Sequence, residues 1–201
     1  MWDDRYGEEG YAYGKGPNDF IRDQAHAFTP GARILCLASG EGRNAVYLAT
    51  RGYRVTAVDL SVVGLEKTRL LASENGVEVH TIHADLASFD LGEAIWDGVT
   101  SVFAHVPPAV RSALHARVVR GLKPGGILLL EAYTPAHLDL PGRGGPPPHA
   151  TQVFMTAEGL EQELAGLSFD LIRETQRTLR EGRYHEGLSG VVQVLARKPM
   201  Q

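Results

Sequence analysis

The segment Ile34–Ala49, ILCLASGEGRNAVYLA, contains the pattern that decides the fold. Its first residues form a short apolar run typical of a buried strand, and the small residues Ala38–Gly42 follow as a tight turn. From Arg43 onward the apolar residues recur at helical spacing. A strand, a glycine turn and a helix in this order bring the backbone close to a nucleotide-like ligand, because Gly40 and Gly42 carry no obstructing side chain. The turn alone is equally compatible with a purely structural loop.

A second apolar strand, Tyr53–Leu60, carries a carboxylate at Asp59, seventeen residues after Gly42. An acidic residue at the tip of the neighbouring strand can accept hydrogen bonds from both hydroxyls of a ribose. The structural alternative is that Asp59-Leu60-Ser61 only caps the helix beginning near Val62. Gly40-x-Gly42-x-x-Ala45 satisfies the dinucleotide-binding pattern, with alanine in its last place. The same stretch also fits binding of S-adenosyl-L-methionine (SAM).

The chain has 201 residues, one cysteine and a net charge of −4. We expect one domain, residues 1–201, in which residues 1–30 form an aromatic cap or lid segment. The mild charge argues against nucleic-acid binding, and no apolar run approaches the ~20 residues that span a bilayer. The acidic, aromatic N-terminus resembles neither a signal nor a transit peptide. Cys36 lies within a strand as a packing residue and suits a reducing compartment, so we expect a cytoplasmic protein.

Strands and helices alternate from residue 33 to about 165, and two strand-like segments without an intervening helix follow. The expected strands are Arg33–Ala38, Tyr53–Val58, Val77–His83, Val99–Ala104, Ile127–Tyr133, Phe169–Leu179 and Leu188–Arg197. The expected helices are Arg43–Arg51, Val62–Glu74, Ala109–Gly121 and Thr156–Ala165. The last two strands should form an antiparallel hairpin joined by residues 180–187, and Lys123–Gly126 should form a turn. Pro135–Ala150, rich in glycine and proline, should be a long loop at the ligand-binding edge of the sheet.

As a set, these motifs resemble the class I SAM-dependent methyltransferases. The residues that carry the resemblance are ILCLASGEGRN, VTAVDLS, ADLASFD, WDGVTSVFAH and GLKPGGILLLEAY. The N-terminal YAYGKGPNDFI and the short length are similar, more narrowly, to small bacterial methyltransferases grouped with the tellurite-resistance protein TehB, and more distantly to the thiopurine methyltransferases. The resemblance implies an α/β, Rossmann-like sheet of seven strands in the order 3-2-1-4-5-7-6, with strand 7 antiparallel and helices on both faces.

The resemblance also implies SAM as the cofactor. The residues that it assigns to cofactor binding are Ala38, Ser39, Gly40, Gly42, Arg43, Asp59, Leu60, Asp85, Leu86 and Ala104. Asp59 would hold the ribose hydroxyls, Leu60 would pack on the adenine, and Asp85 would accept a hydrogen bond from the adenine amino group. The chain departs from the family at Cys36, where an acidic residue is usual, and at Ala38, where glycine is usual.

Three residues are candidates for catalysis. His105 follows the fourth strand, where it could orient a substrate or accept its proton, and its structural alternative is a cap on the strand end. Arg177 and His185 lie in or near the terminal hairpin, and an arginine and histidine pocket would suit a small oxyanion. Tyr6 and Tyr13, together with Tyr11, would either fold over the cofactor as a lid or fasten the N-terminus to the core.

The expected function is therefore SAM-dependent methyl transfer to a small molecule, with a soft or anionic nucleophile such as a thiol or a selenium or tellurium oxyanion. We expect no nucleic-acid or membrane partner, and a monomer or homodimer. No metal site is expected, because strand alternation sends His80 and His83 to opposite faces. Two alternatives stay open, an NAD(P)-dependent oxidoreductase and a non-catalytic SAM-binding protein.

Overall fold

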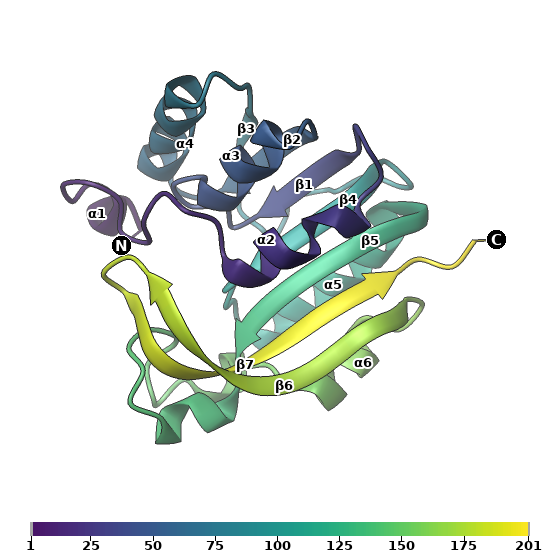
Figure 1. Cartoon of the computed structure of the whole chain (residues 1–201). Helices are drawn as coiled ribbons and strands as arrows, with labels where there is room; N and C mark the ends of the chain where they lie inside the picture. The colour runs from purple at the N-terminus through teal and green to yellow at the C-terminus, as the bar shows by residue number, and fades with distance from the viewer. Residues whose placement is uncertain (1, 201) are drawn as a thin grey trace.

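The computed structural model describes residues 2–200, in which seven strands form one mixed sheet (Figure 1). The strands are β1 (Arg33–Leu37), β2 (Arg54–Asp59), β3 (His80–His83), β4 (Trp96–Val102), β5 (Leu122–Tyr133), β6 (Ser168–Glu181) and β7 (His185–Arg197). Their order is β3-β2-β1-β4-β5-β7-β6, and β7 runs antiparallel to both of its neighbours. The structure thus confirms the strand order and the antiparallel strand that the family resemblance implied.

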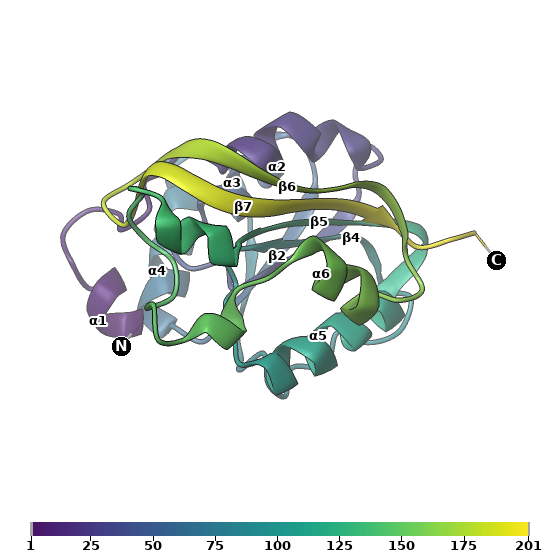
Figure 2. The ribbon, with the colours of Figure 1, turned by 90° about the horizontal axis from the view of Figure 1, so that it is seen from below.

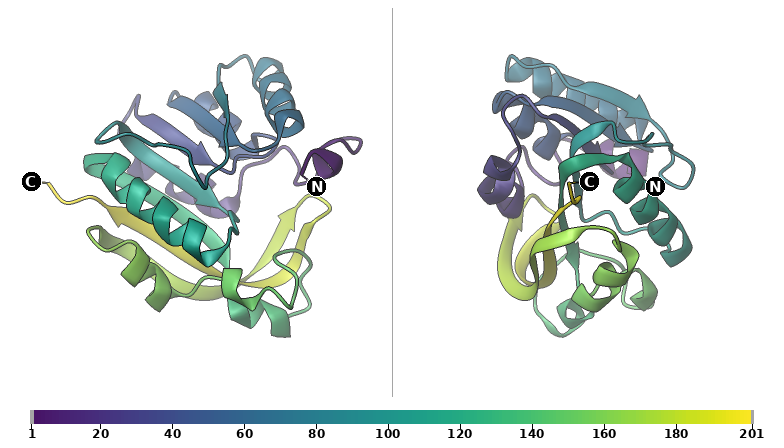
Figure 3. Two further views of the ribbon diagram at one scale, coloured as in Figure 1. Left: turned by 180° about the vertical axis from the view of Figure 1, so that it is seen from behind. Right: turned by 90° about the vertical axis from the view of Figure 1, so that its right-hand side faces the viewer.

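Helices cover both faces of the sheet, as expected (Figures 2 and 3). They are α1 (Trp2–Tyr6), α2 (Asp19–Gln24), α3 (Arg43–Thr50), α4 (Val62–Glu74), α5 (Pro108–Gly121) and α6 (Ala157–Glu163), with short 3-10 turns η1 (Ala25–Ala27), η2 (Pro135–Asp139) and η3 (Thr151–Val153). The helices α2, α3 and α4 contribute to one apolar cluster, and α5 and α6 to the other. Within residues 2–200, no helix has both the length and the apolar character that crossing a membrane requires.

Strand β1 shows why the sheet is buried on both faces. Leu35 and Leu37 belong to the cluster beneath α5 and α6, whereas Ile34 and Cys36 belong to the cluster beneath α2 and α3. Alternate side chains of a strand point to opposite faces, so a continuous apolar run supplies both clusters. Burial raises the pKa of the Cys36 thiol to about 12. This cysteine is therefore a packing residue, as the sequence predicted.

The terminal hairpin is longer and more tightly connected than predicted. β6 continues to Glu181 and β7 starts at His185, so three residues form the connection instead of eight. Gly182, at φ 69°, supplies the left-handed conformation that this tight turn needs. The extended hairpin bends toward the N-terminal segment (Figure 1), and the Arg183 N–H donates to the Ala12 carbonyl at 2.9 Å. Side chains at the hairpin tip consequently lie beside the N-terminal tyrosines.

Residues 123–126 also differ from their prediction as a turn before the fifth strand. They lie inside β5 as an irregularity, because Trp96 pairs with Leu122 whereas Gly98 pairs with Ile127. Gly125 has φ 77°, and its N–H donates to the Lys198 carbonyl at 2.8 Å. The irregularity accommodates the extra residues of β5. Beyond it, β5 stays paired with β4 as far as Glu131 and with β7 as far as Tyr133.

Candidate functional site

A cavity of about 650 Å³ lies at the carboxyl ends of the parallel strands. Its inner side is formed by the turn after β1, by the ends of β2 and β5, and by residues 102–106 at the end of β4. Its outer side is formed by the N-terminal segment, by the Gly- and Pro-rich loop and by the tip of the β6–β7 hairpin. Ligands of open α/β sheets bind at this edge, so the cavity is the candidate site.

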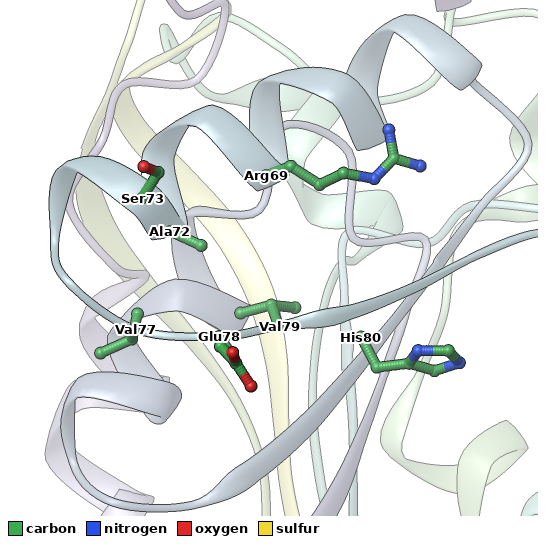
Figure 4. Close-up of a pocket in the computed structure, with 7 residues that line it drawn as sticks. All are labelled: Arg69, Ala72, Ser73, Val77, Glu78, Val79 and His80. Atoms are coloured by element: carbon green, nitrogen blue, oxygen red, sulfur yellow. The ribbon is translucent and has the colours of Figure 1, made fainter.

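Figure 4 shows a second, more open hollow between α4 and residues 77–80. Its volume is about 470 Å³, and the side chains along it come from one helix and one irregular segment. It contains none of the residues that the sequence predicted for cofactor binding or catalysis. The larger cavity is therefore the relevant one.

The Asp59 carboxylate is fixed at the end of β2 by two backbone donors. Its Oδ2 accepts from Gly40 N at 2.7 Å, and its Oδ1 accepts from Ser61 N at 2.8 Å. Within the capping segment Asp59–Ser61 that the structural alternative named, Ser61 is the side-chain cap of α4, and its hydroxyl accepts from Gly64 N at 3.0 Å. Burial raises the pKa of Asp59, although the backbone donors oppose this shift. Each carboxylate oxygen has a further lone pair with which to accept from a hydroxyl group.

Asp59 is joined in the cavity by the other residues predicted for the adenosine. Leu60 lines the cavity with 54% of its surface exposed, which is unusual for a large apolar side chain in a concave site. Asp85 and Leu86, after β3, line the same cavity, and Asp85 Oδ1 accepts from Ala87 N at 2.8 Å. The structure therefore brings both aspartates and an apolar platform together from adjacent strand ends.

The turn after β1 adopts conformations that favour glycine. Ala38 has φ 46°, so this alanine takes the left-handed conformation at some cost in strain, about 1 kcal/mol. Gly40, at φ 55°, packs so closely against Tyr6 that a Cβ atom at this position would come within 2.7 Å of the Tyr6 hydroxyl. Gly42 does not line the cavity. A Cβ atom on Gly42 would come within 2.5 Å of Thr68, so its glycine serves the packing of α3 against α4.

Two buried polar atoms along the turn lack a partner within the described residues 2–200. They are Ser39 Oγ and Arg43 Nη1, and both residues line the cavity. The other terminal nitrogen of Arg43, Nη2, donates to Glu181 Oε2 at 2.6 Å. Buried polar groups are almost always hydrogen-bonded, so two unpartnered atoms at one cavity fit a polar ligand bound there.

The far end of the cavity is aromatic. Four rings form what we call the aromatic wall: Tyr13, Phe103, Tyr133 and His185. The Phe103 ring centroid is 4.6 Å from Tyr133 and 4.5 Å from His185, and Tyr13 lies 4.4 Å from His185. Tyr133 Oη and His185 Nδ1 are buried without a hydrogen-bond partner in residues 2–200. The wall therefore offers flat apolar surface together with two unsatisfied polar atoms.

His105 lines the cavity, but both of its ring nitrogens are engaged by the protein. Nδ1 lies 3.0 Å from the Val153 carbonyl, and Nε2 accepts from Tyr133 N at 3.2 Å. A neutral ring protonated on Nδ1 satisfies both contacts. Burial lowers the pKa of His105 to about 4. This geometry corresponds to the structural alternative, in which His105 braces the ends of β4 and β5 and is not a free base.

His185 lines the cavity near the hairpin tip. Its Nδ1 lies 3.6 Å from Glu181 Oε2, a separation too long for a hydrogen bond of good geometry. Burial lowers the pKa of His185, and the facing carboxylate only partly offsets that effect. Burial therefore makes this ring a weaker base than an exposed histidine.

Arg177 does not line the cavity, in contrast to its prediction as a catalytic residue. Its guanidinium lies in a buried ion-pair cluster, where it donates to Glu131 at 3.0 Å and to Glu181 at 2.8 Å. Asn18 and Gln193 donate to the same Glu131 carboxylate. Sequence reasoning missed this cluster, although one signal was present, since Glu131 is the single charged residue in the apolar run ILLLEAY.

The N-terminal segment lies along the outer side of the cavity. Tyr6 and Tyr13 line it, whereas Tyr11 points away, with its hydroxyl 3.4 Å from the Lys67 carbonyl. The segment is fastened at Ala12, whose N–H donates to Glu41 Oε2 at 2.7 Å. The segment is thus anchored to the core and contributes two rings to the cavity, and its role as a lid over the cofactor stays a prediction.

Comparison with known proteins agrees with this architecture. Residues 34–126 match the family of methyltransferase domains. The uncharacterized methyltransferase YbaJ of Bacillus subtilis is 35% identical over 105 residues, which make up 49% of this chain and 39% of that protein. The chain spans between 39% and 52% of the length of the first few curated relatives it matches.

Solved structures with the same fold cover nearly the whole chain. TehB from Haemophilus influenzae superposes with a TM-score of 0.75 at 21% identity, covering 90% of this chain and 62% of that one. A SAM-dependent methyltransferase from Methanosarcina mazei superposes with a TM-score of 0.67 at 20% identity, covering 92% and 100%. Residues 34–126 are thus similar to methyltransferase domains, and the chain shares the fold of these solved structures, among them TehB. This similarity implies SAM as the cofactor.

Proposed function

We propose that this chain is an enzyme that transfers the methyl group of SAM to a small molecule whose attacking atom is soft and anionic. One observation carries the proposal. A single cavity joins an end suited to an adenosine, at Asp59, Leu60 and Asp85, to an aromatic end, and the one further carboxylate among the described lining residues, Glu41, is engaged by Lys67 and by the Ala12 N–H. The first end suits the cofactor, and the second suits an acceptor that needs no strong base.

The cofactor end offers each part of SAM a chemically suitable group. Asp59 accepts from the ribose hydroxyls, and the exposed face of Leu60 packs on the adenine. The unpartnered Ser39 Oγ and Arg43 Nη1 supply donors for the methionine carboxylate. When bound, SAM supplies a methyl group already activated on a sulfonium. The chain's own residues are then required mainly for positioning.

The acceptor end has no strong general base. His105 has both nitrogens engaged, and burial lowers the pKa of His185, which makes its ring a weak proton acceptor. Oxygen and nitrogen acceptors usually need a base to remove a proton, whereas a thiolate or a selenium or tellurium oxyanion attacks without one. Arginines along the outer side of the cavity favour an anion there. A soft, anionic acceptor is the class that these groups serve best.

Calorimetric titration with S-adenosylhomocysteine tests the cofactor end. Asp59→Ala removes two charge-assisted hydrogen bonds to the ribose, so we expect affinity to fall about 100-fold, which corresponds to about 3 kcal/mol. Asp90→Ala is the matched control, because Asp90 is an exposed aspartate outside the cavity, paired with Arg120. Equal affinities of the Asp59→Ala variant and the wild type contradict the placement of the ribose.

Mass spectrometry of methylated products tests the acceptor class. We expect transfer to one or more thiols, selenite or tellurite, and none to matched amines or alcohols. Transfer only to amines or alcohols contradicts the soft-acceptor assignment. Tight binding of S-adenosylhomocysteine with no transfer in a broad metabolite panel supports the second candidate, a non-catalytic SAM-binding protein. The departures from the family pattern at Cys36 and Ala38 are the observations that favour this second candidate.

A further inference from the structure

Residues 142–145, with the sequence GRGG, press closely against the acceptor end of the cavity. A Cβ atom on Gly142 would come within 2.3 Å of the Leu188 carbonyl oxygen. A Cβ atom on Gly144 would come within 2.6 Å of Tyr133 Oη, and Gly144 has φ 118°. Side chains other than hydrogen do not fit at these positions. The segment therefore presents one side chain, that of Arg143.

The backbone of Arg143 is fixed on β7. Its N–H donates to the Glu186 carbonyl at 2.6 Å, and its carbonyl accepts from Glu186 N at 3.1 Å. Gly145 lies on the face of the Tyr133 ring, where a Cβ atom would come within 3.0 Å of Cδ2. The side chain of Arg143 is exposed and lines the cavity. The hydrogen-bonded backbone thus positions the Arg143 guanidinium at the edge of the aromatic wall.

Arg143 differs from the other arginines along the cavity because no neighbouring side chain of the described residues holds its guanidinium. Four arginines line the cavity, and neighbouring side chains hold three of them: Arg5 by Tyr13, Arg43 by Glu181 and Arg183 by Glu8. The Arg143 guanidinium has no ion-pair or hydrogen-bond partner within residues 2–200. An unpaired guanidinium beside a cavity is available to an anionic ligand.

A buried polar atom gives a second, independent indication of a ligand at this place. Tyr133 is fully buried, and its hydroxyl has no partner in the described part of the chain. His185, beside it, is 7% exposed, and its Nδ1 faces the Glu181 carboxylate at 3.6 Å. A Cβ atom on Gly144 would come within 2.8 Å of His185 Cδ2 as well as close to Tyr133 Oη, so both residues meet the GRGG segment at one point.

We propose that Arg143 determines acceptor specificity, and that the acceptor is a small aromatic thiol that also carries a carboxylate. Its ring would lie on the aromatic wall, and its carboxylate would pair with the planar Arg143 guanidinium through two parallel hydrogen bonds. This inference rests on the proposed function. The acceptor sulfur loses its proton to solvent and forms a bond to the methyl carbon. The bond from that carbon to the sulfonium sulfur breaks, and its electron pair stays on the sulfonium sulfur.

Steady-state kinetics with a matched pair of acceptors tests the proposal. The pair is 4-mercaptobenzoate and thiophenol, which differ only in the carboxylate. Arg143→Gln should raise KM for 4-mercaptobenzoate between 10- and 100-fold, with kcat little changed, because one charge-assisted ion pair contributes about 1.5–3 kcal/mol. KM for thiophenol should stay unchanged. Arg180→Gln is the control. Arg180 is an exposed residue of β6 that lies opposite Glu186 of β7 and does not line the cavity.

Calorimetry with 4-(methylthio)benzoate and its neutral analogue thioanisole tests Arg143 without turnover. The titration is made with the S-adenosylhomocysteine complex and with the protein alone. Tighter binding of the carboxylate compound, lost in Arg143→Gln and kept in Arg180→Gln, supports the proposal even if no thiol is methylated. Absence of this preference in the wild type overturns it, as does an equal effect of Arg143→Gln on both compounds. Failure of S-adenosylhomocysteine itself to bind contradicts the proposed function instead.

Discussion

The cofactor end of the cavity comes from residues 38–86, whereas the aromatic wall at the acceptor end comes from segments as far apart as Tyr13 and His185. At the cofactor end, backbone donors fix the Asp59 carboxylate: Ser61 N is two residues away, and Gly40 N lies in the turn after the neighbouring strand β1. At the acceptor end, ring contacts and ion pairs between distant segments hold the side chains. The comparison indicates that SAM binding depends on local chain geometry, and acceptor binding on the assembled fold.

Charge distinguishes the two ends as well. Asp59 and Asp85 face the cofactor end, whereas arginines surround the acceptor end. Beneath the acceptor end, the carboxylates of Glu131 and Glu181 balance two arginines in a buried cluster. Burial alone would raise the pKa of Glu181, but its contacts with His185 and the arginines hold it well below the usual range. These ion pairs thus connect the β6–β7 hairpin, which carries His185, to α3 and β5.

The largest predicted effect concerns the acceptor end: Glu181→Gln should lower the free energy of unfolding, because Glu181 belongs to the buried ion-pair cluster beneath that end. Removing this charge leaves Arg43 uncompensated, and breaking a buried ion pair typically destabilises a protein by about 3–5 kcal/mol. The measurement is the free energy of unfolding in urea. Glu161→Gln, on the exposed side of α6, should change stability by less than about 0.5 kcal/mol. Similar small changes in both variants would show that the cluster does not hold the acceptor end together.

A second test uses pH to examine His105, which braces the same end. Its pKa of about 4 in the folded chain lies below the ordinary value of 6.5, so the unfolded chain takes up the proton first. This contribution to stability is fully present above pH 6.5 and is lost as the pH falls toward 4, by about 3 kcal/mol. His105→Gln keeps a donor and an acceptor but cannot titrate. Urea unfolding at pH 7 and pH 4 should therefore show a smaller loss in the variant, and equal losses would contradict the assignment.

The smallest predicted effect concerns the cofactor end. Leu60→Ser removes apolar surface that the adenine would cover, so we expect S-adenosylhomocysteine affinity to fall about fivefold, or about 1 kcal/mol. The free energy of unfolding should hardly change, because Leu60 is exposed in the free protein. Leu70→Ser is the matched control, since Leu70 is 61% exposed on α4 outside the cavity. Calorimetry that shows the same affinity in both variants would remove Leu60 from the adenine site.

Several site residues could be predicted because they follow directly from strand ends. Asp59 was predicted from its place at the end of the second strand, whereas Asp85 was assigned by the family resemblance, and the structure brings both to one cavity at the edge where the parallel strands end. Arg177 could not be placed in this way. Its position on the hairpin was anticipated, but its orientation depends on the buried Glu131 on β5, which lies 46 residues earlier in the chain. Sequence spacing carries no information on such a partner.

The sequence by itself determined the alternating strands and helices, the two-sided burial of β1 and the position of Asp59, because alternation, glycine turns and strand ends act over a few residues, and the family resemblance supplied the sheet order. Only the tertiary structure decided the acceptor end. The pairing of β6 with β7 as far as His185, the contacts of residues 142–145 with Tyr133, and the engagement of both His105 nitrogens arise from groups distant in sequence. Their positions follow from packing and charge compensation in the folded chain, which no local pattern specifies.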